Sequence, residues 1–372
     1  MEARVIIKVL ERRGKKLLAG ILGFFLGADK TGPEVLDGRE IRKLLVIRQQ
    51  NQMGDMLLAV PALRGIRRRF PEAEISFIAA TINAEVVRNN PFIDELIIYS
   101  KKRYLRNPIS LVRLIAGLRR KRFDLVIVLN TVSFSVTSML LAVASGASLR
   151  AGVTSRPFGS DLSERFYHIE LPLPPERELE SMHESEHNLY PLGVLDVKES
   201  DLSSLLVPAD SEREQAERFI REEVKGDFIL VHPGAGKVAN IWPPANFAAA
   251  ADYLAHRYSL RIVVVEGPAD AEVFRDFIRS CQAEAVLLRS PSVGCLGSVM
   301  TRAAVTLCND TGIMHIAGAV GAPSVAVFGP TDPGRWKPAV DNVTAVRADD
   351  HRIESVAVED VIRAAEEFLT AG

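Results

Sequence analysis

Short apolar runs alternate with amphipathic stretches along most of the chain. Continuous apolar runs bounded by turn residues are typical of strands buried on both faces of a parallel sheet, and apolar residues spaced three and four apart are typical of helices packed on it. The runs predict strands over residues 43–48, 74–79, 125–129, 228–232, 261–265, 305–308 and 324–328. The amphipathic stretches predict helices over residues 56–69, 111–122, 176–187, 211–224, 246–256, 271–281, 312–320 and 358–369.

The order of these elements predicts an α/β fold with two domains. Strand and helix alternate in both halves, which indicates two doubly wound parallel sheets, and 372 residues exceed one ordinary core. We expect an extension over residues 1–40, an N-terminal Rossmann-like domain over 41–205 and a C-terminal one over 206–372. As an alternative to packing within the C-terminal domain, the last helix packs back on the N-terminal domain. Ligands of such sheets bind beyond the carboxyl ends of the strands, which places the site in a cleft between the domains.

Charge is distributed unevenly along the chain. Residues 1–130 contain 25 Lys and Arg but 13 Asp and Glu, whereas the whole chain has a net charge of −1. The basic runs at 67–69, 101–103 and 119–122 carry no interleaved aromatic residues. Nucleic acid is therefore a poorer partner than phosphate on a lipid or sugar, with a solvated basic surface as the alternative. Three cysteines without metal-ligand spacing disfavour both disulfides and a zinc site and indicate a reducing compartment.

The first 28 residues form a distinct basic segment. Its apolar residues share one helical face, whereas residues 17–28 form an uncharged stretch that is too short to span a bilayer. The members of this face are Ile6, Leu10, Leu17, Ile21 and Phe24. We expect an amphipathic helix that lies on an anionic membrane surface. Docking on the protein's own body is the alternative.

Polar residues and glycines collect where three predicted strands end. The first cluster is Met53-Gly54-Asp55, after the strand over 43–48. Asp55 suits a helix N-cap, which alone would explain it, but a carboxylate at the edge of the cleft can also take a proton from a hydroxyl.

The second cluster follows the strand over 228–232. Gly234, Gly236 and Ala239 match the dinucleotide pattern G-x-G-x-x-A, but Trp242-Pro243 intervenes before the helix. The glycines therefore do not open that helix, which argues against NAD and favours a loop that contacts phosphate.

The third cluster begins at Cys308 and ends at His315. A buried strand ends there and a helix begins at Thr311 or Gly312, so free amides and the positive end of the helix dipole favour a diphosphate. The alternative is that Asp310 or Thr311 only caps the helix and binds no ligand. Taken alone, His315 would fit a buried histidine of the core.

Together these blocks resemble glycosyltransferase family 9, the ADP-heptose:lipopolysaccharide heptosyltransferases. The specific blocks are Asp310-Thr311-Gly312-x-x-His315 and Val327-Phe328-Gly329-Pro330-Thr331-Asp332-Pro333. Further matches occur, in the family's order, at Gly54-Asp55 with Pro61, at His232-Pro233-Gly234-Ala235-Gly236 with Trp242-Pro243, and at Gly267-Pro268-Ala269-Asp270. The likeness covers residues 43–369.

The resemblance implies the GT-B fold and an inverting, metal-independent transfer of a heptose or related sugar. It implies that Asp55 is the general base and that the donor is a nucleotide-sugar, ADP-heptose in the family, with no cofactor. The residues implied in donor binding are Gly234, Ala235, Gly236, Lys237, Asp270, Asp310, Thr311, Gly312 and His315. The acceptor implied is an anionic lipid-linked saccharide of the lipopolysaccharide core, reached from the cytoplasm at the inner face of the inner membrane.

One departure from the family's pattern affects the donor site. A lysine usually stands two residues before the Trp-Pro pair, where it meets the donor phosphates, but here that position is Asn240 and the nearest lysine is Lys237. Either Lys237 takes that place or the phosphates are bound less strongly. A different nucleotide-sugar, or a protein that binds the donor without turnover, are the alternatives.

Overall fold

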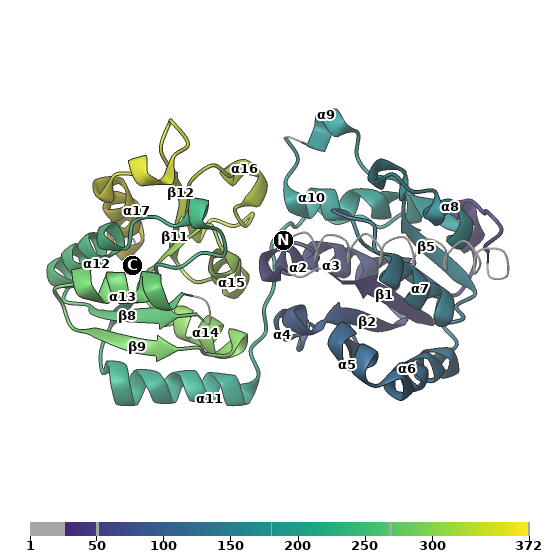
Figure 1. Ribbon diagram of the computed structural model, residues 1–372, viewed down its shortest axis with the longest axis horizontal. Helices are drawn as coiled ribbons and strands as arrows, with labels where there is room; N and C mark the ends of the chain where they lie inside the picture. Colours follow the sequence, from purple (N-terminus) through teal and green to yellow (C-terminus); the bar gives the residue numbers. More distant parts are fainter. Residues whose placement is uncertain (1–26, 50–51, 180, 268–269, 371–372) are drawn as a thin grey trace.

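The computed structural model describes residues 27–49, 52–179, 181–267 and 270–370. Two α/β domains lie side by side, each built on its own six-stranded sheet (Figure 1). The face predicted from Ile6 to Phe24 lies outside the described residues.

The N-terminal sheet confirms the predicted parallel arrangement. Its strands pair in the order β3-β2-β1-β4-β5-β6, and every neighbouring pair is parallel. Their bounds are β1 Lys43–Arg48, β2 Glu74–Ala80, β3 Glu95–Tyr99, β4 Leu125–Val128, β5 Leu149–Val153 and β6 Ile169–Leu171. The described helices of this domain are α2 Met53–Leu57, α3 Val60–Arg69, α4 Ala84–Val87, α5 Lys101–Arg106, α6 Pro108–Lys121, α7 Val136–Ala144, α8 Leu162–Phe166, α9 Glu176–Leu179 and α10 Glu184–Leu189.

The C-terminal sheet repeats the same topology. Its order is β12-β11-β10-β7-β8-β9, so that the domain's first and fourth strands again lie side by side. The strands are β7 Phe228–His232, β8 Arg261–Glu266, β9 Ala285–Arg289, β10 Thr306–Asn309, β11 Ser324–Phe328 and β12 Val343–Arg347. The described helices are α11 Asp210–Phe219, α12 Pro244–Tyr258, α13 Ala271–Ser280, α14 Val293–Met300, α15 Gly312–Val320, α16 Pro333–Trp336 and α17 Val358–Thr370. Strand order reverses between β7 and β10 and between β1 and β4, which is where such folds bind ligands.

The helix predicted over 56–69 is two helices, because Pro61 interrupts it. Proline has no amide hydrogen, so it cannot bond the carbonyl oxygen of Leu57, four residues earlier. Ser204 Oγ donates to that oxygen instead, at 2.7 Å. Asn188 Nδ2 donates to the carbonyl oxygen of Leu58 at 3.3 Å, so the break between α2 and α3 is satisfied by side chains from distant parts of the chain.

Two other helix predictions need correction. The stretch 176–187 contains the separate helices α9 and α10 rather than one helix. The helix α11 begins at Asp210, and its capping carboxylate is Glu212, which accepts from the amide of Ala209 at 2.9 Å. The prediction had this helix begin at Ser211, one residue later.

The connection between the domains runs beside α3 and then reaches the C-terminal domain. Arg64 on α3 donates to the carbonyl oxygens of Asp201 and Ser203, at 2.9 and 2.8 Å. The amide of Leu206 donates to the carbonyl oxygen of Ala319 on α15, at 3.1 Å. Residues from 206 onward thus contact the C-terminal domain.

The last helix lies within the C-terminal domain. α17 packs against α12 and strands β11 and β12, where Val361 and Ala365 are buried in the same apolar cluster as Phe247. This packing differs from the alternative in which the helix returns to the N-terminal domain. Within the described parts of the chain, no helix is both long and apolar enough to cross a membrane.

Candidate active site

A cavity of about 530 Å³ lies between the domains and is lined by both. From the N-terminal domain it receives Gln52, Met53, Gly54 and Asp55, which follow β1. From the C-terminal domain it receives Gly236, Lys237, Asn240, Asp310, Thr311, Gly312, His315, Thr331 and Trp336. The structure therefore brings Asp55 and six of the nine residues expected at the donor into one site.

The amino end of α15 forms one wall of this cavity. The helix begins at Gly312, and Thr311 is its N-cap, with Oγ1 accepting from the amide of Ile313 at 3.3 Å. A Cβ atom added to Gly312 would lie 3.5 Å from Cβ of Met53, so the two domains meet closely at this point. The first-turn amides and the helix dipole make this end of the helix a place for an anion.

A polar cluster fixes Asp310 beside that helix end. Its Oδ2 accepts from Thr331 Oγ1 at 2.6 Å and from Asn240 Nδ2 at 3.0 Å. Burial raises the pKa of Asp310, whereas the hydrogen bond from Thr331 and the charge of Lys237 lower it. Asn240, at the position of the family's lysine, is thus engaged with a carboxylate in this structure.

The loop after β7 is tied to the end of β10 by Asn309. Its Nδ2 donates to the carbonyl oxygens of Pro233 and Gly234 at 2.8 and 3.1 Å, and its Oδ1 accepts from the amide of Trp242 at 3.0 Å. This buried amide side chain holds the loop that carries Lys237 in place; the sequence placed it in the third polar cluster but gave it no role.

Asp270, Gly234 and Ala235 do not line the cavity, although Gly234 and Ala235 directly precede Gly236, which does. Asp270 accepts from His232 Nε2 at 3.1 Å, and this hydrogen bond holds the pKa of the carboxyl below its usual range. A Cβ atom on Gly234 would lie 2.4 Å from the carboxyl carbon of Asp270, so a larger residue there would displace this carboxylate. These residues form a support behind the loop.

Asp55 sits half-buried in α2, beside a fully buried arginine. Arg48 donates to the main-chain oxygen of Asp55 at 3.2 Å and to that of Leu129 at 3.0 Å. Burial raises the pKa of Asp55 and the charge of Glu184 adds to this, whereas Arg48 and Lys237 oppose it. Lys237 lines the same cavity as Asp55 and Asp310, and its positive charge lowers the pKa of both carboxyl groups.

A buried carboxylate joins the two domains next to this site. Glu184 on α10 accepts from Arg335 of α16 at 3.0 Å and contacts His187 Nδ1 at 3.2 Å. Burial raises the pKa of Glu184, but His187 and Arg335 together bring it below the usual value. His183 Nε2 also meets the carbonyl oxygen of Lys337 across the interface, at 2.8 Å.

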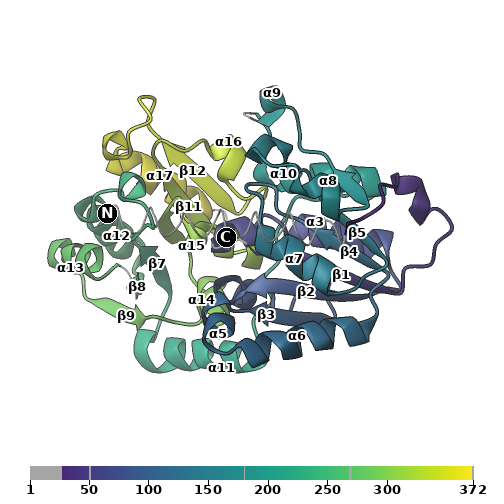
Figure 2. The same cartoon turned by 45° about the vertical axis from the view of Figure 1, so that its right-hand side comes forward.

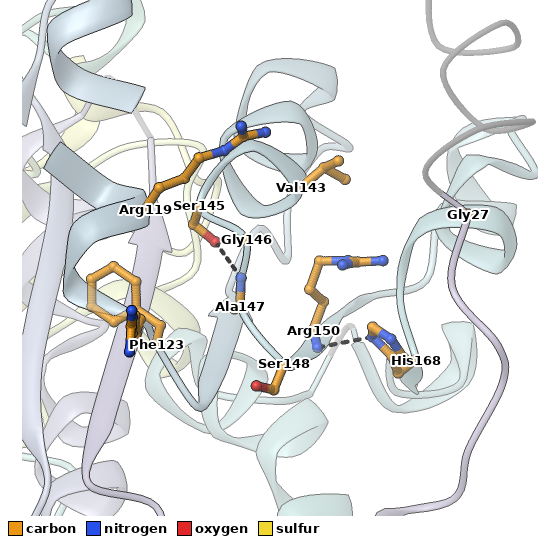
Figure 3. Close-up of a pocket in the computed structure, with 11 residues that line it drawn as sticks. Gly27, Arg119, Phe123, Val143, Ser145, Gly146, Ala147, Ser148, Arg150 and His168 are labelled. Carbon is orange, nitrogen blue, oxygen red and sulfur yellow. Dashed lines mark hydrogen bonds between the residues drawn. The ribbon is translucent and has the colours of Figure 1, made fainter. Parts of the chain in front are cut away.

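A larger cavity of about 750 Å³ occurs elsewhere, within the N-terminal domain (Figure 3). Arg119, Arg150 and His168 line it, and His168 Nδ1 accepts from the amide of Arg150 at 3.1 Å. It lies where β5 begins, and ligands of doubly wound sheets bind at the opposite, carboxyl ends. The smaller cavity between the domains is therefore the candidate active site.

Comparison with known proteins identifies the family. Residues 111–363, more than half of the chain, match the family described as "Glycosyltransferase family 9 (heptosyltransferase)". The chain belongs to glycosyltransferase family 9. This confirms the resemblance stated from the sequence motifs, and the family makes the chain a glycosyltransferase.

Relatives of this family 9 glycosyltransferase match it over most of its length. Lipopolysaccharide heptosyltransferase 3 of Escherichia coli is 26% identical over 306 residues, covering 80% of this chain and 87% of the relative. Among solved structures, a family 9 glycosyltransferase from Veillonella parvula has a TM-score of 0.77 at 22% identity, covering 90% of this chain and 99% of that one. The E. coli ADP-heptose lps heptosyltransferase II has a TM-score of 0.72 at 20% identity, with coverage of 88% and 99%. These likenesses confirm the GT-B fold.

Several residues of the glycosyltransferase's site were missed from the sequence. Thr331 and Trp336 stood in a segment that, apart from the family motif, suggested only a rigid turn. Arg48 did carry a signal, because a charged residue that ends a strand buried on both faces needs a local partner. Glu184 and Arg335 carried none, since each is one among many exposed charges in the sequence and only the fold brings them together.

Proposed function

We propose that this protein is an inverting heptosyltransferase that uses a nucleotide-sugar, ADP-heptose or a close relative, as donor. The observation that carries the proposal is that Asp55 and the amino end of α15 line one cavity at the carboxyl ends of both sheets. A base and an anion site that face one space are what transfer from a sugar diphosphate requires.

In the proposed reaction the acceptor hydroxyl gives its proton to the Asp55 carboxylate and attacks the anomeric carbon. The bond from that carbon to the diphosphate oxygen breaks, and its electron pair stays on the diphosphate. Attack from the face opposite the leaving group inverts the anomeric configuration. The raised pKa of Asp55 suits a base, because a more basic carboxylate takes the proton more readily.

The leaving diphosphate would be stabilised by the chain's own groups. The first amides of α15, the Thr311 hydroxyl and the ammonium group of Lys237 supply hydrogen bonds and positive charge at the cavity. Asp310 Oδ1, which accepts no hydrogen bond from a described residue, would receive a hydroxyl of the sugar. Asp270, Gly234 and Ala235 would support the nucleoside side of the donor. Transfer would then need no metal or cofactor, and activity is expected to persist in a chelator.

The acceptor we propose is an anionic, lipid-linked saccharide of the lipopolysaccharide core. The name of the E. coli relative and the excess of Lys and Arg in residues 1–130 support it. The enzyme would then work in the cytoplasm, at the inner face of the inner membrane.

Replacement of Asp55 tests this function. Asp55→Asn keeps the size of the side chain but cannot take the proton, so transfer should fall by about 10²–10⁴-fold. Donor binding, measured by calorimetry, should persist, and mass spectrometry of the product reports turnover. Near wild-type transfer by a folded Asp55→Asn variant would exclude Asp55 as the base. Donor binding by the unaltered protein without any product would instead indicate a binding protein. A thermal-shift series with ADP-, UDP- and GDP-sugars identifies the donor.

A further inference from the structure

The two helices that follow the edge strand β3 form an unusual basic surface. From residue 101 to residue 122 the chain contains nine Lys and Arg and no Asp or Glu. This stretch comprises α5 and α6, which lie on the outside of the N-terminal domain in both views (Figures 1 and 2). We call it the α5–α6 surface.

α6 carries apolar residues on two faces, and only one of these faces is covered. Leu118 is buried, and Leu114 packs against the same apolar cluster of the N-terminal domain. Ile109 and Val112 point away from that cluster and are 64% and 65% exposed, and Leu105 at the end of α5 is 73% exposed. These three large aliphatic side chains lie close together along the chain and all face water. They therefore differ from the single exposed apolar residues that are normal on a protein surface.

The exposed aliphatic residues of α6 alternate with cations on one helical face. Residues 109, 112 and 116 are three and four apart, and Arg113 and Arg120 lie four residues after 109 and 116, so all five share the outer side of the helix. Such a mixture is typical of helices that lie at the boundary between headgroups and acyl chains.

Most of these cations are not used inside the protein. Lys121 pairs with Glu74 and Glu95, at 3.1 and 2.9 Å, and so belongs to the fold. Six others form no ion pair with any carboxylate in the described parts of the chain: Lys102, Arg103, Arg106, Arg113, Arg120 and Arg122. A surface of this kind fits an anionic partner.

We infer that the α5–α6 surface docks on a bilayer rich in anionic phospholipid. Like charges disfavour a second copy of the same surface or the basic segment 1–28 as its partner. Single-stranded nucleic acid would need aromatic stacking platforms, but the one aromatic residue of the stretch, Tyr104, is buried. The inference goes beyond the transfer reaction and does not depend on which sugar is moved.

Vesicle flotation of the full-length protein tests the inference without donor or acceptor. We expect the protein to float with vesicles that contain phosphatidylglycerol, to stay behind with phosphatidylcholine alone, and to detach in high salt. Two triple variants then separate charge from apolar contact: Lys102→Glu with Arg103→Glu and Arg106→Glu, and Leu105→Ser with Ile109→Ser and Val112→Ser. Each should weaken binding at least about tenfold, because both lipid charge and buried apolar area contribute.

The matched control reverses the charge of three exposed arginines on α11 and in the turn that directly follows it: Arg213, Arg218 and Arg221. This control should bind vesicles like the wild type, and all variants should keep the thermal shift caused by the donor. The inference is overturned if the wild type does not bind anionic vesicles, if both α5–α6 variants bind them like the wild type, or if a single-stranded RNA binds this surface more tightly than the vesicles do. Loss of the donor's thermal shift in the wild type would instead count against the proposed transferase function alone.

Discussion

Gly54 faces the ring of His315 across the domain interface. A Cβ atom added to Gly54 would lie 2.5 Å from Cδ2 of that ring, which is closer than any real contact. His315 is 5% exposed, and burial lowers its pKa to about 4, so the ring is neutral at physiological pH and acts here as a packing surface. The absence of a side chain on Gly54 thus sets how closely α2 approaches α15.

This contact predicts the effect of a single methyl group. Gly54→Ala should force α2 away from α15 and reduce transfer at least about tenfold, because small displacements of reacting groups are costly. Gly54→Ala with His315→Ala should recover part of the lost rate, since the second change removes the obstacle. Gly117→Ala in α6, where a Cβ meets nothing within 4 Å, is the control and should leave the rate unchanged. Equal rates for Gly54→Ala and Gly117→Ala would contradict the steric argument.

Lys237 and Asn240 predict how the donor phosphates are held. If Lys237 supplies the charge, Lys237→Ala should weaken ADP binding about ten- to hundredfold, as expected for a lost charge-assisted hydrogen bond. Asn240→Lys in the Lys237→Ala background should restore binding, because it returns a cation beside Asp310. Isothermal titration with ADP measures both. If Lys237→Ala bound ADP as tightly as the wild type, groups other than Lys237 would bind the phosphates.

The charges around Asp55 predict opposite shifts of the pH profile. The base must be ionised, so kcat/KM should rise with pH through the raised pKa of Asp55. Lys237→Gln removes a charge that lowers this pKa and should move the acid limb to higher pH. Glu184→Gln removes a charge that raises it and should move the limb to lower pH. The exposed Glu359→Gln serves as control, and shifts of the two site variants in the same direction would argue against Asp55 as the titrating group.

The pair between Glu184 and Arg335 predicts an asymmetry in stability. Arg335→Ala leaves the fully buried Glu184 with only His187, so unfolding in urea at pH 8 should become easier by about 2–3 kcal/mol. Glu184→Gln should cost less, because the partly exposed Arg335 can turn to water. Arg213→Ala, which breaks the exposed pair with Asp210, should change the free energy of unfolding by at most about 0.5 kcal/mol. A larger loss for Glu184→Gln than for Arg335→Ala would refute this ordering.

The strands predicted best were those buried on both faces. β1, β7 and β11 have the predicted bounds, because their uninterrupted apolar runs reflect helices on either side of the sheet. None of the four edge strands was predicted. The half-exposed residues of β3, β9 and β12 give no continuous apolar run, and β6 is only three residues long. β5 is buried but was also missed, because Arg150 and Gly152 interrupt its apolar sequence.

The candidate site was predictable where one short segment holds the relevant groups. Asp310, Thr311 and Gly312 are consecutive, so a strand end followed by a helix start was sufficient to place them together. The contact of Glu184 on α10 with Arg335 on α16 depends instead on how the two sheets face each other. Sequence periodicity describes each element's own faces and contains no information on that orientation.

The segment that joins the domains has a mechanical consequence. It is fastened at one end to Leu57 and Arg64 and at the other to Ala319 on α15, so the pivot lies beside the helices that carry the base and the anion site. The contact between α10 and α16 lies on the far side of the cleft from α11 (Figure 1). A rotation of one domain about this pivot would therefore move the contact between α10 and α16 over a long distance, but would displace Asp55 and Thr311 only slightly. Substrates could then be exchanged at the rim while the reacting groups stay close to their working alignment.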